Sequence, residues 1–150
     1  MNIFAHFLLN YVLVSAIYGN PNNYLWLIII FSVFIDLDHI PYILKVKTSL
    51  IKKKFGSESR TRFHELYGIT FFSLIFSILI FFFDTKSIQI AALCLMLHYA
   101  ADLLVGKSRP FYPYIKKEIF LGILPEKYRI KFEFIFTILM VVIIWIFLLN

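Results

Sequence analysis

The chain has 150 residues, of which 61% are hydrophobic and 16% charged, and its mean hydropathy is +0.82. A water-soluble globule could not hide that much apolar surface, so a soluble class is excluded. The apolar residues come in blocks of about 16 to 21, which suit membrane-crossing helices and not the short alternating strands of a barrel. We therefore expect an all-α integral membrane helical bundle, with a single domain over residues 1–150. The lone cysteine, Cys94, excludes an intrachain disulfide.

The meaning of the net charge of +6 depends on where the basic residues lie in the sequence. Fourteen of the fifteen Lys and Arg residues fall within 45–62 and 107–131, and only Lys86 lies elsewhere. Cytoplasmic loops are enriched in Lys and Arg, so both segments are predicted to face the cytoplasm. Residues 19–23 and 84–87 then face the other side, which predicts five spans and a cytoplasmic N-terminus in the cytoplasmic or inner membrane. Membrane lipids are the expected partners, and no nucleic acid is expected.

Apolar blocks and breaker residues predict five helices in chain order. Gly19 and Pro21 end the first helix. Pro41 ends the second and loosens its last turn, because proline lacks a backbone N–H and disfavours helical geometry at the preceding residue. The proline-containing segment 106–131 is predicted to form an interfacial cap. The expected helices cover residues 3–18, 24–40, 63–83, 88–105 and 132–149, and the last is a plain C-terminal anchor.

All four histidines lie near predicted cytoplasmic helix ends, which scattered histidines would not do. His6 lies about one turn into the first helix, and His39 ends the second. His64 begins the third helix, and His98 lies near the end of the fourth. Asp102 follows His98 by four residues and therefore shares its helix face. Four antiparallel helices are thus predicted to bring these side chains to one depth.

Imidazoles and carboxylates without thiolates suit a catalytic metal site better than a closed structural zinc site, which prefers cysteine. Asp36 and His39 share a face at i and i+3, whereas Asp38 joins them through the loosened turn. Bound metal makes hydroxide available near neutral pH, so hydrolysis is the expected reaction. The predicted cofactor is one or more divalent ions, with zinc first and manganese or iron next. The candidate ligands are His6, Asp36, Asp38, His39, His64, His98 and Asp102.

Residues beside these ligands are candidates for other roles. Glu65 is the candidate general base, and Asp38 is a second candidate catalytic residue. The arginines Arg60, Arg62 and Arg109 would bind an anionic ester substrate. Arginines at membrane boundaries are also common topology determinants, which is the alternative interpretation of these three.

Each motif has a structural interpretation as well. His98 and Asp102 could be a neutral hydrogen-bonded pair, and His6 could extend to the interface. His64 and Glu65 could simply begin a helix, because acidic residues favour its first turn. The same ligands could also serve a divalent metal or proton transporter, although the third and fifth helices offer few polar residues to continue a path. A non-catalytic scaffold stapled by metal is a further alternative.

The motifs together resemble those of the YdjM family of small inner-membrane proteins, which are classed as metal-dependent hydrolases. The family pattern has an early His, then Asp-x-Asp-His, then Arg-x-x-x-His opening a helix, then His-x-x-x-Asp followed by Gly and a Pro-aromatic stretch. The match covers roughly residues 1–115. Ser59 stands where the family often has histidine, and Glu65 where it often has serine. The corresponding residues are His6, Asp36 to His39, Arg60 to His64, His98 to Asp102, Gly106 and Pro110 to Tyr114.

The arrangement is also similar to that of zinc-dependent phospholipase C and the related nucleases. Those enzymes use a His-x-x-x-Asp helix step with additional His and Asp ligands. This similarity implies hydrolysis of phosphoesters, such as a phospholipid or another lipid phosphate that enters sideways from the bilayer at the cytoplasmic face.

Overall fold

The computed structural model describes residues 2–40, 61–115, 117–121 and 126–149, without the side chains of 38, 62, 126 and 147–149. These residues form α-helices joined by short 3-10 helices and one small hairpin. This all-α architecture confirms the fold class predicted from the apolar blocks. The α-helices are α1 (Ile3–Tyr18), α2 (Leu25–Val33), α4 (Leu66–Phe83), α5 (Lys86–Val105) and α6 (Arg129–Leu149).

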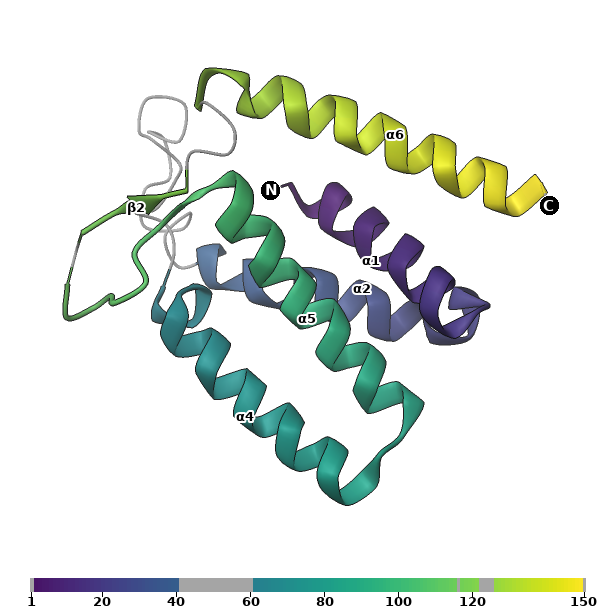
Figure 1. Cartoon of the computed structure of the whole chain (residues 1–150), viewed down its shortest axis with the longest axis horizontal. Coiled ribbons are helices and arrows are strands. Elements are labelled where there is room, and N and C mark those ends of the chain that lie inside the picture. Colours follow the sequence, from purple (N-terminus) through teal and green to yellow (C-terminus); the bar gives the residue numbers. More distant parts are fainter. Residues whose placement is uncertain (1, 41–60, 116, 122–125, 150) are drawn as a thin grey trace.

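Helix α5 is the centre of the bundle. Helices α1, α2 and α4 all pack against it, and α6 packs along α1 at the outer edge (Figure 1). The core on the α1 side consists of Val14, Ile28, Ile90 and Cys94. The core on the α4 side consists of Ile35, Phe76, Ala91, Leu95 and Tyr99.

The second expected helix is divided into three pieces. The 3-10 helix η1 (Pro21–Tyr24) leads into α2, and a second 3-10 helix, η2 (Phe34–His39), follows α2 directly. The 3-10 winding of η2 replaces regular α-helix in this stretch, but it is tighter and not looser than an α-helix. Ile40 keeps αR backbone angles, with φ of −57° and ψ of −48°, so the predicted loss of helical geometry before Pro41 is wrong. The third expected helix is also shorter than predicted, because a 3-10 turn, η4 (Arg62–His64), precedes α4.

Two of the described helices, α4 and α5, are long and apolar enough to cross a membrane alone. Helix α1 and residues Pro21–Leu37 form a pair bent by 120°, which counts as a third candidate if the pair is one broken span. The described residues therefore contain two or three candidate spans, where the sequence predicts five. Length explains this for α1 and α2: 16 residues of α1 rise about 24 Å and nine of α2 about 14 Å, both short of a core of about 30 Å. Helix α6 has 21 residues and is long enough, but Arg129, Lys131 and Glu133 lie in its first two turns.

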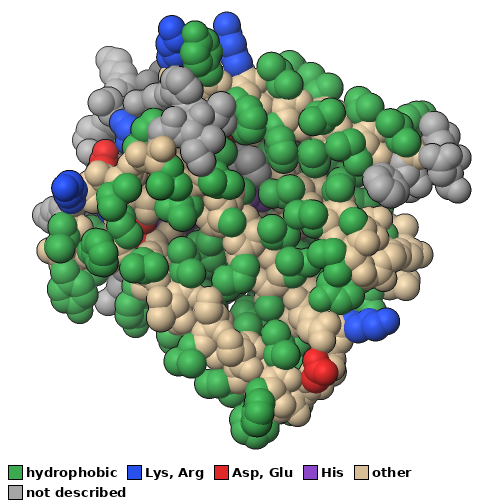
Figure 2. Space-filling model, in the orientation of Figure 1, with side chains coloured by type: hydrophobic (Ala, Val, Ile, Leu, Met, Phe, Trp, Pro, Cys, Tyr) green, Lys and Arg blue, Asp and Glu red, His purple; other side chains and the backbone are tan. Residues whose placement is uncertain are grey.

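The segment after α5 contains a hairpin that the sequence did not predict. Strand β1 (Lys107–Ser108) pairs antiparallel with β2 (Ile119–Phe120), and the turn projects sideways from the bundle (Figure 1). A 3-10 turn, η5 (Glu126–Tyr128), then leads into α6. Figure 2 shows hydrophobic side chains over most of the visible face, as expected for a surface in lipid.

Candidate metal centre

Two side chains of the site come from the last two turns of α5. His98 and Asp102 lie four residues apart and therefore share a helix face. His98 is 0% exposed and Asp102 only 4%. A carboxylate buried this deeply in a membrane bundle requires a compensating positive charge or strong hydrogen bonds.

A third side chain, Asp36, comes from η2. Its Oδ1 atom lies 3.6 Å from Nε2 of His98. Because residues i and i+3 eclipse each other in a 3-10 helix, His39 lies on the same face as Asp36, with its Nε2 atom 3.8 Å from Oδ1. Asp36 thus faces His98 of α5, and the His39 ring lies beside the ring of His64 on η4, with centroids 5.0 Å apart.

His64 is held in place by a close approach of η4 to α4. A Cβ atom at Gly68 would lie 1.8 Å from the backbone oxygen of Phe63, so only glycine lets η4 fold back over the first turn of α4. The hydroxyl of Tyr99 donates to the same Phe63 oxygen at 2.6 Å. Nε2 of His64 then lies 2.6 Å from Oδ2 of Asp102.

His6 reaches the site from the first turns of α1. That helix begins with a side-chain cap, because Oδ1 of Asn2 accepts from the backbone N–H of Ala5 at 2.8 Å. Nε2 of His6 lies 3.1 Å from Oδ1 of Asp102. The His6 ring also stacks on the His98 ring, with centroids 3.8 Å apart and planes 10° from parallel. His6 therefore joins the site across the bundle from His64.

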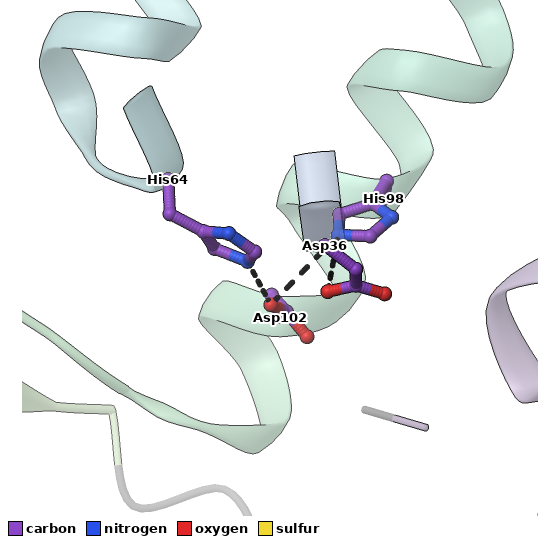
Figure 3. A group of neighbouring side chains, drawn as sticks. All are labelled: Asp36, His64, His98 and Asp102. Carbon is purple, nitrogen blue, oxygen red and sulfur yellow. Dashed lines mark hydrogen bonds and ion pairs between the residues drawn. The ribbon is translucent and has the colours of Figure 1, made fainter. Parts of the chain in front are cut away.

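Four of these residues form a compact set of possible metal ligands, hereafter the cluster: Asp36, His64, His98 and Asp102. Each offers one ligand atom, and these atoms all lie within 4.8 Å of one another. Figure 3 shows the four side chains pointing toward one another from η2, η4 and α5. Zinc ligands at about 2.0 to 2.1 Å in a tetrahedral site lie about 3.3 Å from one another, so small side-chain movements would complete the fit.

The hydrogen bonding of His98 favours a metal ligand over a satisfied core histidine. Its Nδ1 atom lies 2.7 Å from the backbone oxygen of Ser32, which can only accept, so Nδ1 carries the proton. Nε2 of His98 and Oδ2 of Asp36 are buried and have no hydrogen-bond partner among the described residues. Metal-binding histidines typically donate their other ring N–H to a backbone carbonyl in this way.

The charge of the cluster leads to the same conclusion. In their ionised forms Asp36 and Asp102 carry two negative charges, and imidazoles in their neutral form carry none. Side-chain exposure is only 12% for Asp36 and 6% for Asp102, so water screens these charges little. One divalent cation would balance them, and the nitrogen and oxygen donors suit zinc, manganese or iron.

The remaining predicted residues, Glu65 and the three arginines and Asp38, are not members of this cluster, and some of them lie outside the described residues. Glu65 is only 1% exposed and accepts a short hydrogen bond from the hydroxyl of Ser108 on β1. The guanidinium of Arg109 lies over the Tyr112 ring, 4.7 Å from its centroid. The predictions for Arg60 and for the side chains of Asp38 and Arg62 lie outside the described residues.

Several residues that shape the site had no assigned role in the sequence reasoning. These residues are Ser32, Tyr99 and Ser108, whose hydrogen-bond partners lie 66, 36 and 43 residues away in the sequence. No short motif reveals pairs so far apart. The position of Gly68 could have been recognised in the sequence. A glycine in the first turn of an otherwise apolar helix often marks a close backbone approach.

The fold and the cluster together define an all-α integral membrane protein with a buried histidine and carboxylate centre. Comparison of the sequence with family models gives a match to the YdjM inner membrane protein family over residues 1–149. The chain therefore belongs to this family, and it is an inner-membrane protein, as its sequence predicts. No curated protein and no solved structure matches it.

These comparisons extend one resemblance and leave the other without support. The family match runs well beyond residue 115, where the motif resemblance ended, and includes α6. The similarity to zinc-dependent phospholipase C and the related nucleases is not shown, because no solved structure matches the chain.

Proposed function

We propose that this protein is a metal-dependent hydrolase of the inner membrane that acts on phosphoesters. The single observation that carries the proposal is the orientation of His98. Its protonated Nδ1 is tied to Ser32, and its Nε2 faces the carboxylates of Asp36 and Asp102 at 3.6 and 4.0 Å. A ring nitrogen without a proton and two carboxylates that face it are all electron-pair donors, and a divalent cation between them would use all three.

The cluster would hold one divalent ion, most simply zinc, with Asp36, His64, His98 and Asp102 as ligands. His6 and His39 flank it through Asp102 and Asp36 and could complete a second position or orient the ligands. The sequence also assigns Asp38 to this group. When bound, the ion would supply Lewis acidity toward a phosphoryl oxygen and acidify a water molecule.

The remaining steps would fall to side chains around the cluster. Glu65 would act as general base, with Ser108 orienting its carboxylate through their hydrogen bond. The arginines Arg60, Arg62 and Arg109 would bind the anionic ester. A lipid phosphate is the proposed substrate class, because many large hydrophobic side chains are exposed on the helices that carry the site, and Figure 2 shows hydrophobic side chains across one face. By the positive-inside tendency that end faces the cytoplasm.

Metal analysis of detergent-purified protein tests the proposal. Wild-type protein is expected to carry near-stoichiometric divalent metal, and His98→Ala and Asp102→Asn are expected to lose it. Asp84→Asn is the matched control, since Asp84 is an exposed carboxylate at the opposite end of the bundle. Full metal content in both cluster variants would contradict the metal centre.

Activity requires a separate measurement. Metal-loaded protein in lipid vesicles is expected to release phosphate or a phosphorylated headgroup from lipid phosphates, and Glu65→Gln is expected to lose this activity while keeping its metal. Loss of stability on chelation, with no activity on mono- and diesters, would favour the scaffold alternative instead.

The transporter alternative is disfavoured by an apolar layer about two helical turns from the site. Val14, Ile28 and Ile90 belong to one core cluster, and all three are 0% exposed. An ion leaving the cluster toward the other side of the membrane would have to cross this apolar layer. Metal uptake into proteoliposomes would restore the transporter as the better explanation.

A further inference from the structure

A second buried polar layer lies one helical turn from the metal centre. Asn10 follows His6 by four residues on α1, Ser32 precedes Asp36 by four on the α2 side, and the residue four before His98 on α5 is Cys94. Asn10 is 1% exposed, and both Ser32 and Cys94 are 0% exposed. Each of three helices thus contributes one residue to this layer and one residue to the site.

A single side chain connects the three helices. Nδ2 of Asn10 donates to Oγ of Ser32 at 2.8 Å and to the backbone oxygen of Cys94 at 3.2 Å. Both amide hydrogens of Asn10 are therefore used to link α1 to α2 and to α5. Ser32 continues the network upward, because its own backbone oxygen accepts the Nδ1 proton of His98 at 2.7 Å.

We infer that Asn10 and Ser32 are positioning residues for the metal centre. The Asn10 amide fixes Ser32 against α5, and the Ser32 carbonyl fixes the ring orientation of His98, so that Nε2 points toward Asp36 and Asp102. This inference rests on the proposed function, because it assigns the network to metal binding.

Stability alone does not explain this hydrogen-bond network. Oδ1 of Asn10 is buried and has no hydrogen-bond partner among the described residues. An unsatisfied amide oxygen in a dry core is destabilising, and an apolar side chain of similar size would avoid that cost. What the amide provides, and leucine could not, is a directional link that sets the relative height of the three helices below the site.

Metal affinity in the folded protein tests this assignment. We would measure zinc binding by chelator competition, and the cobalt absorption spectrum, for Asn10→Leu and Ser32→Ala. Partners that orient metal-bound histidines typically change affinity by about 10- to 100-fold, so Asn10→Leu is expected to weaken zinc binding by that factor and to alter the cobalt spectrum. Ser32→Ala keeps the backbone oxygen that binds His98, so it is expected to weaken zinc binding by only about 10-fold.

Two matched variants provide the controls. Tyr18→Phe removes an interhelical hydrogen bond to Gln89, at the far end of α1 and α5, and should leave zinc affinity unchanged. Tyr11→Phe, also on α1, removes an exposed hydrogen bond to Asn22 and should likewise leave zinc affinity unchanged. A purely structural role would lower the thermal stability of the metal-free protein and leave zinc affinity and the cobalt spectrum as they are.

The outcomes separate this inference from the proposed function. Wild-type zinc affinity in both folded Asn10→Leu and Ser32→Ala overturns the positioning role and leaves the metal centre intact. If Asn10→Leu does not fold, Ser32→Ala decides by the same criterion. Absence of zinc binding in the wild type overturns both the positioning role and the proposed function.

Discussion

The two ends of the bundle treat polar residues in opposite ways. At the end away from the cluster, polar groups pair at or near the surface: Tyr11 donates to Asn22, Tyr18 to Gln89, and Gln89 to Asp84. At the cluster end, imidazoles and carboxylates are buried and face one another. The far-end pairs are complete hydrogen bonds, whereas at the cluster Nε2 of His98 and Oδ2 of Asp36 are buried without a hydrogen-bond partner among the described residues.

The comparison of the two ends indicates which polar residues of a membrane bundle have a function beyond stability. Hydrogen-bonded pairs at helix ends stabilise turns, and each contributes modestly in lipid. A buried acceptor such as Nε2 of His98, which lies 3.6 Å from Oδ1 of Asp36 and makes no hydrogen bond within the described residues, indicates a binding function instead.

Metal binding should produce the largest difference between the ends. Zinc at about 1,000 times its dissociation constant stabilises a protein by about 4 kcal/mol. Wild type and Asp84→Asn are therefore expected to show the same large rise in thermal stability on adding zinc, and Asp102→Asn none. Differential scanning fluorimetry in detergent measures this, and an equal zinc response in Asp102→Asn would remove the distinction between the ends.

Substitutions of glycine should give the second-largest difference in stability between the two ends. Gly68→Ala places a Cβ atom against the Phe63 oxygen and is expected to cost about 3 kcal/mol and to weaken zinc binding, because η4 and His64 must move. Gly19→Ala at the far turn meets open space but has φ of +83°, so it should cost about 1 to 2 kcal/mol and leave zinc affinity unchanged. Unfolding titrations with and without zinc measure both effects.

Tyrosine hydroxyls provide a smaller and cleaner comparison. Tyr99→Phe leaves the Phe63 oxygen without its 2.6 Å donor near the cluster, and the expected loss is about 1.5 kcal/mol. Tyr18→Phe removes a longer, partly exposed bond of 3.3 Å, so the loss should be about 0.5 kcal/mol. Equal losses of unfolding free energy in the two variants would indicate that water has the same access to both hydrogen bonds.

Helix caps should show the smallest effects. Asn2 caps α1 with a 2.8 Å bond, and Asn2→Ala is expected to cost about 1 kcal/mol. Thr85 caps α5 with a longer bond of 3.4 Å, so Thr85→Ala should cost about 0.5 kcal/mol. Neither variant should alter zinc affinity by more than about twofold, since neither side chain touches the cluster. A larger change for Asn2→Ala would show that the start of α1 controls the position of His6.

Much of the site could be predicted from the sequence, for a simple physical reason. Ionisable side chains are costly in lipid, so those that remain stand out against apolar blocks, and helix periodicity says which of them share a face. His98 with Asp102 and Asp36 with His39 could be paired by spacing alone. Their convergence with His6 and His64 followed from alternating helix directions. The all-α membrane fold followed from composition.

Tertiary structure decided the rest, because it depends on contacts between residues far apart in the chain. Within the described residues, η1 and η2 divide the second apolar block into pieces, and its α-helix, α2, is too short to cross a membrane alone. The tautomer of His98 depends on a carbonyl 66 residues away, and the position of His64 depends on a glycine with no room for a side chain. Sequence spacing records which groups can share a face, and only packing decides which atoms meet.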